Sequence, residues 1–427
     1  MSVTAIGEAA LTGVMRPDRT PHTLADWRDL GGYRAVETAL REHSPQSLRD
    51  LMLASNLRGR GGAGFATGKK WGFMPLPDDP VPGDGPRYLC VNADEMEPCT
   101  FKDRLLMEAT PHRLVEGVVI AAYALGASEV WVLIRDAYRA AIAAVRRAVE
   151  EAYEAGYLGR DVLGTGFSLE VRLHESAGRY IVGEETALME SIEGRRPVPR
   201  QKPPYPSQSG LWGRPTTINN VESLCNAPLV VERGAEGFLA LSNTGEGGTK
   251  LYGVSGRVAE PRIVEAPMGT TARDLIAAAG GMREGRSLLA FQPGGGSSGF
   301  LGPEHLDVPL DFDNTQAAGS WFGTGMLIVL DDAADPLAVV RRHMAFYARE
   351  SCGWCVPCRE GLPWVVRVLD RFLAGRATRA DLELLHMHVR LGGQSFCALM
   401  GGAMDPLASA LERFAGHFEA GLAERAA

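Results

Sequence analysis

Apolar residues in the first half of the chain fall into short runs separated by helical patterns. The run Val130–Ile134 predicts a buried strand, and the apolar spacing over Tyr138–Tyr153 predicts an amphipathic helix. A helical pattern at Leu48–Leu57, a strand signal at Tyr88–Val91 and another near Leu169–Leu173 continue this alternation. Strands that alternate with helices predict an α/β sheet whose strands are partly parallel.

The pattern changes in the second half. Strand signals at Lys250–Val254 and Met326–Leu330 flank a helical Thr271–Ala279, which predicts a small α+β unit. Further on, the apolar spacing predicts a four-helix bundle with helices at Leu337–Glu350, Leu362–Leu373, Arg379–Leu391 and Pro406–Leu422. A chain of 427 residues exceeds the ~250–300 residues of one hydrophobic core, so we expect domains over 1–240, 241–334 and 335–427.

No segment has the pattern of a membrane span or an export signal. The longest apolar stretch, Leu114–Ile134, contains Glu116 and Glu129, and carboxylates are costly at bilayer depth. We interpret this stretch as a buried helix followed by a strand. The N-terminal residues lack a basic start followed by an apolar core. We therefore expect a soluble protein without a direct membrane span, which could still dock on a membrane complex.

Composition excludes some classes of function. The net charge is −8 and no long run of one sign occurs, whereas nucleic-acid binding needs a basic face that neutralises phosphates. The 7 cysteines are an odd number and three of them are closely clustered, which does not indicate a disulfide framework. In a chain without an export signal, clustered cysteines indicate metal ligands.

The cysteine cluster is the strongest chemical signal. Gly353 and Pro357 predict that the segment around it is a loop wrapping around a bound group, because neither residue favours a regular helix there. A fourth ligand is supplied by the one other cysteine of the C-terminal region, so the predicted set is Cys352, Cys355, Cys358 and Cys397. Four thiolates in this three-plus-one spacing favour a [4Fe–4S] cluster, with a zinc site as the alternative. Cys90 and Cys225 lie in apolar surroundings and are expected to be buried.

A glycine-rich loop indicates a phosphate group. Gly59, Gly61 and Gly64 formally match G-x-G-x-x-G, but the preceding segment looks helical, so an ordinary Rossmann loop is not indicated. Closely spaced glycines still let backbone N–H groups approach a ligand, and Arg60 and Lys70 add positive charge. A flexible surface loop is the alternative.

Polar side chains follow the predicted strand that contains Cys90. Asn92, Asp94 and Glu95 come at its end, and in α/β sheets ligands bind beyond the carboxyl ends of strands. Residues 183–186 and 219–222 each open a helical stretch with similar polar groups. Between 194 and 216 six prolines exclude a regular helix, so this segment is either a linker between domains or an ordered loop covering a ligand.

Taken together, these segments resemble the family of FMN- and NADH-binding flavoprotein subunits of respiratory complex I. The matching motifs are GRGGAGF with TG and KW, NADE with EP and TFKDR, GEET, TTINNVE, and ESCGWCVPCREG with a distal cysteine. They occur in the family's order from Arg58 to Cys397. The resemblance also extends to diaphorase subunits of NAD-linked hydrogenases and formate dehydrogenases. The chain has no room for the extra domains that several of those carry, so we expect the complex I subunit.

The resemblance implies three units: a Rossmann-like FMN and NADH domain, a ubiquitin-like (β-grasp) soluble-ligand-binding domain, and a four-helix bundle holding one [4Fe–4S] cluster. It implies FMN contacts at Gly61, Gly62, Lys70, Asn92, Asp94, Glu95, Gly183, Glu184, Asn219 and Asn220. It implies NADH contacts at Gly59, Arg60, Gly64, Phe65, Phe73, Glu97, Tyr180, Glu185, Lys202 and Tyr205. The cluster ligands are the four cysteines named above.

The same resemblance implies a mechanism, partners and a location. NADH gives a hydride to FMN and electrons then pass singly to the cluster and on toward quinone. No general base is assigned, and Glu95, Glu97 and Glu185 are expected to position the cofactors. Expected partners are a thioredoxin-like [2Fe–2S] subunit and a large iron–sulfur subunit of the complex I peripheral arm. The expected location is the cytoplasmic side of a bacterial membrane. A zinc-stabilised, non-catalytic nucleotide-binding protein is the alternative of another class.

Two residues depart from the family pattern. Met96 and Cys99 occupy positions where small residues are expected, commonly glycine at the second. Their bulk is expected to change how nicotinamide stacks on the flavin, or how readily the flavin is reoxidised.

Overall fold

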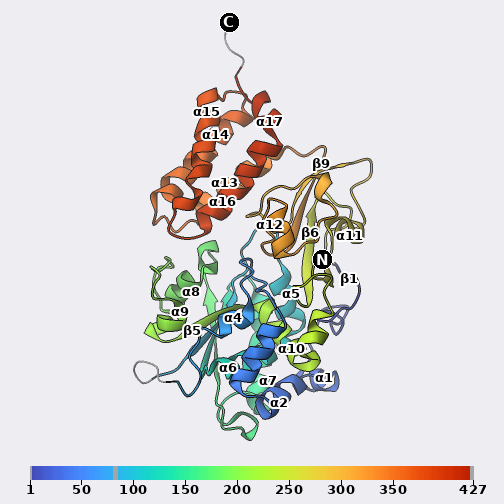
Figure 1. Ribbon diagram of the computed structural model, residues 1–427, viewed down its shortest axis with the longest axis vertical. Helices are drawn as coiled ribbons and strands as arrows, with labels where there is room; N and C mark the ends of the chain where they lie inside the picture. Colours follow the sequence, from blue (N-terminus) through green and yellow to red (C-terminus); the bar gives the residue numbers. More distant parts are fainter. Residues whose placement is uncertain (1, 80–84, 424–427) are drawn as a thin grey trace.

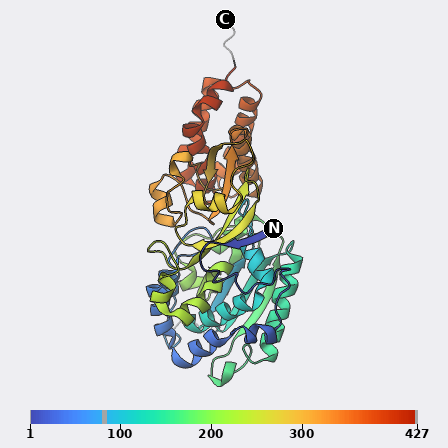
Figure 2. The same ribbon diagram turned by 90° about the vertical axis from the view of Figure 1, so that its right-hand side faces the viewer.

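The computed structural model describes residues 2–79 and 85–423. Residue 1 and residues 424–427, which belong to the first and third expected domains, lie outside the described residues. Figures 1 and 2 show an elongated molecule with helices at its C-terminal end, a part built on a parallel sheet at the opposite end, and a second sheet between them.

The first part is organised by a four-stranded sheet. Its strand order is β4-β3-β2-β5, and every neighbouring pair is parallel. The sheet is therefore fully parallel, where the sequence predicted a partly parallel one. The strands are β2 (Tyr88–Ala93), β3 (Glu129–Arg135), β4 (Glu170–Ser176) and β5 (Thr216–Asn220). The strand β5 was not predicted, because its five residues include only one large apolar side chain, Ile218.

Helices cover both faces of this sheet. On one face, Leu89 and Val91 belong to the main apolar core, which also includes most of the buried helix α6 (Pro111–Leu125). On the other face, Cys90 and Ile218 pack with apolar residues of α8 (Glu185–Ile192). The remaining helices of this part are α1 (Leu24–Asp29), α2 (Arg34–Glu42), α3 (Pro45–Ala54), α4 (Thr67–Trp71), α5 (Lys102–Ala109), α7 (Arg139–Glu154), α9 (Pro206–Ser209) and α10 (Val221–Leu239).

The predicted helices and strands of this part are confirmed with small shifts. Leu114–Ile134 is α6 followed by β3, as expected, and α7 covers the predicted amphipathic helix. The helix expected at Leu48–Leu57 begins earlier, because Ser44 caps its N-terminus by accepting from Ser47 N. It ends at Ala54. Cys90 and Cys225 are both fully buried, as predicted.

The second sheet has the order β1-β7-β6-β9-β8 and mixed strand directions. Its edge strand β1 comes from the N-terminus and pairs in parallel with β7. The strands are β1 (Ser2–Ala5), β6 (Thr249–Gly256), β7 (Arg262–Pro267), β8 (Leu288–Gln292) and β9 (Met326–Asp331), with helices α11 (Ala272–Ala278) and α12 (Phe312–Ala317). The expected small α+β unit is therefore present, but of its strands only β6 and β9 were predicted, and β1, β7 and β8 are additional.

A buried carboxylate fixes the N-terminal segment on this sheet. Glu265 of β7 is fully buried and accepts hydrogen bonds from Leu11 N at 2.8 Å, Thr12 N at 2.8 Å and Thr12 Oγ1 at 2.6 Å. It also accepts from Thr249 Oγ1 at 2.7 Å. Four donors satisfy a carboxylate without a basic partner, so this burial does not leave an unpaired acceptor.

The C-terminal part is helical. It contains α13 (Pro336–Glu350), α14 (Leu362–Leu373), α15 (Arg379–Arg390), α16 (Leu399–Arg413) and α17 (Ala415–Ala420). The single last helix predicted over Pro406–Leu422 is wrong. The helix α16 starts at Leu399 and continues through Pro406, and Phe414 with φ −111° and ψ 29° separates it from α17. The prediction began at the proline because proline favours the first turn of a helix.

The segment that carries three clustered cysteines is only partly a loop. Residues 351–355 are irregular, as predicted, but Pro357–Gly361 forms a wide helical turn that leads into α14. Cys358 therefore lies on a helical turn rather than in a loop. Within residues 2–79 and 85–423, no helix combines the length and apolar character needed to cross a bilayer.

Candidate functional site

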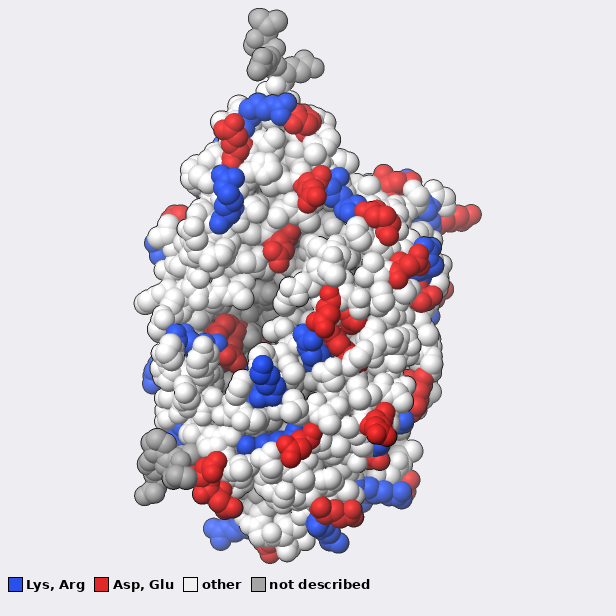
Figure 3. Space-filling model, viewed as in Figure 1, with Lys and Arg blue, Asp and Glu red and all other residues white. Residues whose placement is uncertain are grey.

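The predicted flavin residues meet at the carboxyl edge of the parallel sheet. The chain runs from β2 outward to β3 and β4 and then returns to the other side of β2 as β5, so the strand order reverses between β2 and β5. Asn92 of β2 lies opposite Asn220 of β5 at this point. Ligands in open α/β sheets bind at such a reversal. The space-filling view shows a hollow on this side of the molecule, with acidic and basic side chains at its rim (Figure 3).

The glycine-rich loop approaches β5 closely. A Cβ added to Gly61 would lie 3.0 Å from Cβ of Asn220, a contact tighter than side chains normally make, so glycine favours this close approach. Trp71 of α4 donates from Nε1 to Asn219 Oδ1 at 3.1 Å. Trp321, from the loop before β9, donates from Nε1 to Gly62 O at 3.2 Å. These contacts bring the loop, β5 and the second sheet's loops together.

Asp94 has an unused oxygen at the strand end. Its Oδ2 accepts from Ser176 Oγ at 2.6 Å, while Oδ1 is buried without a hydrogen-bond partner. Burial raises the pKa of Asp94 to about 6. Gly183, on the adjacent turn, has no neighbour within 4 Å of an added Cβ, and its carbonyl accepts from Asn92 Nδ2 at 3.3 Å. An unsatisfied buried acceptor beside open space fits a ligand that brings hydroxyl donors, as a ribityl chain does.

Glu95 instead acts at a helix end. Its two oxygens accept from the backbone N–H groups of Asp103 and Arg104 at 2.9 and 3.1 Å, which caps the N-terminus of α5. Burial and the neighbouring Asp103 raise the pKa of Glu95 to about 7. The Glu95 carboxylate therefore stabilises the start of α5, and its charge depends on pH near neutrality.

The segment that opens α8 carries a compact charged group. Lys70 Nζ lies 3.2 Å from Glu185 Oε2, and Lys202 binds Glu185 Oε1. Burial opposes ionisation of Glu185, but the two lysines outweigh it, and its pKa is lowered. Glu184 accepts from Thr186 N and Ala187 N at 2.9 Å each, which caps α8. The proline-rich segment is thereby an ordered loop attached to the site through Lys202, rather than a free linker.

Glu97 and Tyr180 form a second polar group. Tyr180 Oη donates to Glu97 Oε2 at 2.6 Å, and Ser297 N donates to Glu97 Oε1 at 2.8 Å. Burial raises the pKa of Glu97. Tyr180 packs edge-on against Phe346 and Tyr347 of α13. All three parts of the chain therefore meet around this carboxylate.

Three aromatic side chains near the site are exposed. Phe65 is 45% exposed, Phe73 is 55% exposed, and their ring centroids lie 5.9 Å apart. Tyr205 is 54% exposed on the proline-rich segment. Exposed aromatic faces of this kind suit stacking with a nucleotide base.

Not every predicted residue presents its side chain to the site. Arg60 is fully buried, and its guanidinium donates to Gly247 O at 2.7 Å and Thr249 O at 3.2 Å. The backbone N–H of Arg60 donates to Ser223 Oγ at 2.8 Å, so neither its guanidinium nor its N–H is free for a ligand in this structure. Gly59 N donates to Phe65 O at 2.9 Å, which closes the loop on itself.

The four predicted cluster cysteines lie together. Cys358 belongs to the core of the helical part, and Cys352, Cys355 and Cys397 pack against that core. Burial and the neighbouring Cys355 raise the pKa of Cys358 to about 12, and burial raises that of Cys397 to about 11. Among the described residues, no three His, Cys, Asp or Glu side chains have the geometry for one metal ion. Four cysteines gathered at one place supply the thiolates that an iron–sulfur cluster requires.

A hydrogen bond joins the turn that carries Tyr180 to the segment that leads into the cysteines. Glu350, two residues before Cys352, accepts from Tyr180 N at 3.2 Å and pairs with Arg179 at 3.2 Å. A residue predicted for NADH is therefore linked to the position two residues before the first predicted cluster ligand.

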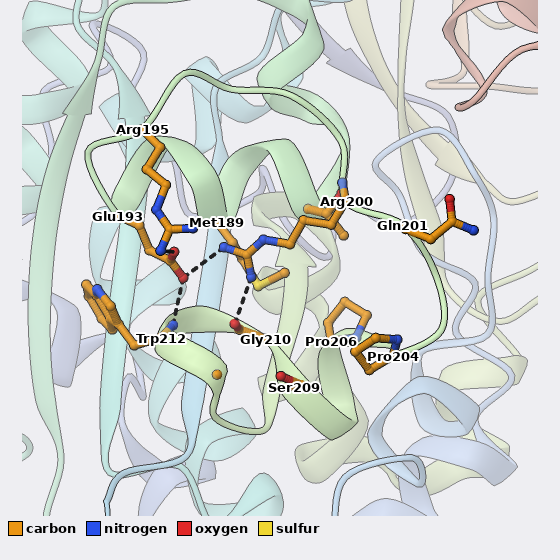
Figure 4. Close-up of a pocket in the computed structure, with 12 residues that line it drawn as sticks. Met189, Glu193, Arg195, Arg200, Gln201, Pro204, Pro206, Ser209, Gly210 and Trp212 are labelled. Carbon is orange, nitrogen blue, oxygen red and sulfur yellow. Dashed lines mark hydrogen bonds and ion pairs between the residues drawn. The ribbon is translucent and has the colours of Figure 1, made fainter. Parts of the chain in front are cut away.

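A cavity lies beside this site rather than in it. It measures about 250 Å³ and lies under the proline-rich segment (Figure 4). Arg200 crosses it and pairs with Glu193 at 2.8 Å, and Arg195 pairs with Glu193 at 3.0 Å. Its charges are thus paired within the protein.

Sequence reasoning missed several residues of this region. Ser297, Trp321, Tyr347, Glu350 and Arg196 all contact it from other parts of the chain. Glu350 opens the ESCGWCVPCREG motif but was given no role of its own, and the other four carry no local motif, because each reaches the site through tertiary folding. Asp103 also contacts the site, since it accepts from Asn220 Nδ2 at 2.6 Å. It lies in the TFKDR motif, so the sequence did offer a signal for this residue.

Family models match most of the chain. The Nuo51 FMN-binding domain matches residues 52–229. The SLBB domain matches 251–301, and the NADH-ubiquinone oxidoreductase-F iron-sulfur binding region matches 338–421. The first match covers the parallel sheet and its glycine-rich loop, and the last covers all four clustered cysteines.

Similar proteins agree with these matches. The chain is 48% identical to the F subunit of NADH-quinone oxidoreductase from Escherichia coli (strain K12), over 96% of this chain and 92% of that one. It is 46% identical to the protein of the same name from Mycobacterium bovis (strain ATCC BAA-935 / AF2122/97), over 90% and 86%. Its fold is similar to a chain in the crystal structure of an NAD+-reducing [NiFe]-hydrogenase in the H2-reduced state. That comparison has a TM-score of 0.83 and 35% identity, and covers 96% of this chain and 68% of the other.

Proposed function

This chain belongs to the family of NADH-quinone oxidoreductase F subunits, and from that premise we propose which of its residues carry the electron transfer. The chain is an oxidoreductase flavoprotein subunit that uses FMN, NADH and a [4Fe–4S] cluster. When bound, FMN supplies the conversion of a two-electron hydride donor into one-electron steps that a cluster accepts. The observation that carries the proposal is the hydrogen bond from Tyr180 N to Glu350, which lies two residues before Cys352.

The proposed FMN site is the carboxyl edge of the parallel sheet. The free oxygen of Asp94 and the open space at Gly183 support hydroxyl binding there, and Gly61 and Gly62 support close approach of the glycine-rich backbone. Lys70 supplies positive charge at the same place. The full proposed set is Gly61, Gly62, Lys70, Asn92, Asp94, Glu95, Gly183, Glu184, Asn219 and Asn220.

The proposed NADH site adjoins it. Phe65, Phe73 and Tyr205 offer aromatic faces for the adenine. The ion pair of Lys202 and Glu185 offers charged groups that can bind polar groups of the nucleotide. Glu97, held by Tyr180, orients the nicotinamide end. The full proposed set is Gly59, Arg60, Gly64, Phe65, Phe73, Glu97, Tyr180, Glu185, Lys202 and Tyr205.

The work of the chain itself is binding and positioning. Glu95, Glu97 and Glu185 fix geometry and local charge, and no side chain is needed to remove a proton during hydride transfer. Cys352, Cys355, Cys358 and Cys397 are the proposed cluster ligands. Ligation requires thiolates, so the raised pKa values of the buried cysteines imply that cluster binding releases protons.

The finer architecture and the assembly are part of the same proposal. We infer domains over 1–240, 241–334 and 335–427, the second ubiquitin-like and the third a four-helix bundle. The three family-model matches fall within these ranges. The proposed partners are a thioredoxin-like [2Fe–2S] subunit and a large iron–sulfur subunit, in a peripheral arm on the cytoplasmic side of a bacterial membrane.

The test is anaerobic purification followed by analysis of metal, flavin and NADH–ferricyanide activity. We expect one FMN and four iron atoms per chain, with NADH-dependent reduction. Cys355→Ala should abolish the cluster spectrum while some reduction of FMN by NADH remains, and Cys225→Ala is the matched buried-cysteine control. Stoichiometric zinc with neither iron nor flavin would reject the proposal.

A diaphorase role in a hydrogenase is the second candidate, favoured by the structural similarity to the NAD+-reducing hydrogenase. Affinity purification of the chain from its host separates the two. Recovery of quinone-reducing activity supports the first role, and recovery of hydrogen-dependent NAD+ reduction supports the second.

A further inference from the structure

One guanidinium from the proline-rich segment reaches the cysteine segment. Arg196 Nη2 donates a hydrogen bond of 2.7 Å to the backbone carbonyl of Cys352. The next two carbonyls, those of Gly353 and Trp354, accept from Arg359 Nη1 at 3.1 and 3.2 Å. Two guanidinium groups therefore cover three successive carbonyls beside a proposed cluster ligand.

The two arginines differ in their charge balance. Arg359 pairs with Glu360 at 3.1 Å, which partly neutralises it. Among the ion pairs of the described residues, Arg196 has no carboxylate partner. Its positive charge therefore acts on the cysteine segment without local compensation. A cation held beside a cluster ligand favours the redox state of the cluster that carries more negative charge.

The position of Arg196 is fixed by its own segment. Pro197 follows it, and the residue before a proline is confined to extended backbone conformations. Four residues on, Arg200 N donates to Thr186 Oγ1 at 2.8 Å, and the Arg200 side chain pairs with Glu190 and Glu193 of the α8 region. The segment is thus anchored on α8, and the guanidinium is held in place before any electron arrives.

We propose that Arg196 is a redox-tuning residue, which raises the reduction potential of the cluster by holding a positive charge on the Cys352 carbonyl. The inference rests on the proposed function, because it needs a cluster at these cysteines. Accepting one electron makes the cluster more negative by one charge. The Arg196 guanidinium stabilises that reduced state relative to the oxidised one, and so it favours transfer from the flavin. Potentials of such clusters are set by net charge and hydrogen bonds in this way.

The experiment is an EPR-monitored redox titration of the purified holoprotein. In Arg196→Gln the ratio of reduced to oxidised cluster at a fixed potential should fall threefold to tenfold, and tenfold corresponds to about 59 mV for one electron. Arg196→Lys keeps the charge and should stay close to the wild type. Arg195→Gln is the matched control, because Arg195 is the neighbouring arginine and pairs with Glu190 and Glu193 instead.

The outcomes are separable. Equal potentials in Arg196→Gln, Arg195→Gln and the wild type would overturn the inference. A shift of the same size in Arg196→Gln and Arg196→Lys would also overturn it, because it would indicate loss of geometry rather than of charge. An exposed charge is screened by salt, so the difference should shrink at high ionic strength. If the wild type itself shows no cluster signal, the proposed function fails, and that result is recognised before any variant is compared.

Discussion

The phenolic hydroxyl of Tyr180 donates a hydrogen bond of 2.6 Å to the buried carboxylate of Glu97. The two residues come from separate segments of the parallel-sheet part, and α13 packs against the tyrosine ring. The geometry of Glu97 thus depends on the helical part as well as on the parallel-sheet part.

Tyr180→Phe should therefore weaken both stability and NADH binding. A hydrogen bond to a charged group contributes about 1.5–3 kcal/mol, and Glu97 would keep only its backbone donors. We expect a lower thermal midpoint and a raised KM for NADH. Tyr153→Phe is the control, because Tyr153 donates to the exposed Glu170 far from the site. A Tyr180→Phe protein with unchanged KM would contradict the proposed role of Glu97.

Stability should fall as pH rises through neutrality. The folded-state pKa is about 6 for Asp94 and about 7 for Glu95, both above their unfolded values, since burial disfavours the carboxylate. The folded chain therefore holds protons that the unfolded chain releases above about pH 4, and this stability is lost as pH passes the folded values.

The check is the thermal midpoint of the flavin-free protein between about pH 3.5 and about pH 7.5, a window that spans the unfolded and folded values. Glu95→Gln removes one of the two groups, so its midpoint should depend less on pH than that of the wild type. Glu419→Gln, at an exposed ion pair, is the control. An identical pH dependence in all three proteins would show that Glu95 does not titrate in this range.

A buried ion pair should be costly to break. Lys250 of β6 and Glu222 of α10 are both fully buried and lie 2.7 Å apart, and Lys102 lies 3.0 Å from the same carboxylate. Burial alone would raise the pKa of Glu222, but the surrounding cations lower it to about 2. Lys250→Met removes one of those cations from a charged carboxylate. Breaking such a pair costs about 3–5 kcal/mol.

Glu222→Gln combined with Lys250→Met should recover part of that loss, because it also removes the buried carboxylate that has lost one of its two lysines. The thermal midpoint of the two variants measures the difference. If the double variant is no more stable than Lys250→Met, the loss comes from packing rather than charge.

The backbone at Cys99 favours glycine. Its φ is +65°, in the left-handed region that costs a non-glycine residue about 1–2 kcal/mol. Cys99→Gly should therefore be more stable than Cys99→Ala by roughly 1 kcal/mol, because alanine keeps the strain and glycine removes it. The comparison of the two variants by thermal unfolding isolates the backbone from the thiol. Equal stability would show that the strain is not present in solution.

Local pattern predicted the elements with long apolar periodicity. The strand β3, the helix α7 and the helices α13 to α15 all lie close to their predicted bounds. The edge strand β1 and the short β5 were missed, because too few apolar residues mark them, and β7 and β8 of the second sheet were not predicted either. The start of the last helix was wrong because Pro406 suggested a first turn where the structure has a helix interior.

The candidate site shows the same division. Asn92, Asp94 and the clustered cysteines follow from their position after a strand or from their spacing. The contacts of Arg196 and Glu350 could not be predicted, because they join residues separated by 156 and 170 positions. Only the folded chain brings those positions together.

The pairing of β1 with β7 also has a consequence for synthesis. Leu11 and its partner Glu265 are 254 residues apart in the sequence. At ribosomal rates of about 5–20 residues per second, the N-terminal segment waits roughly 10–50 seconds for its partner strand to be translated. Nascent β1 stays unpaired for that interval, so the second sheet is completed after the parallel sheet. A tag on the N-terminus would therefore affect the late pairing of β1 with β7.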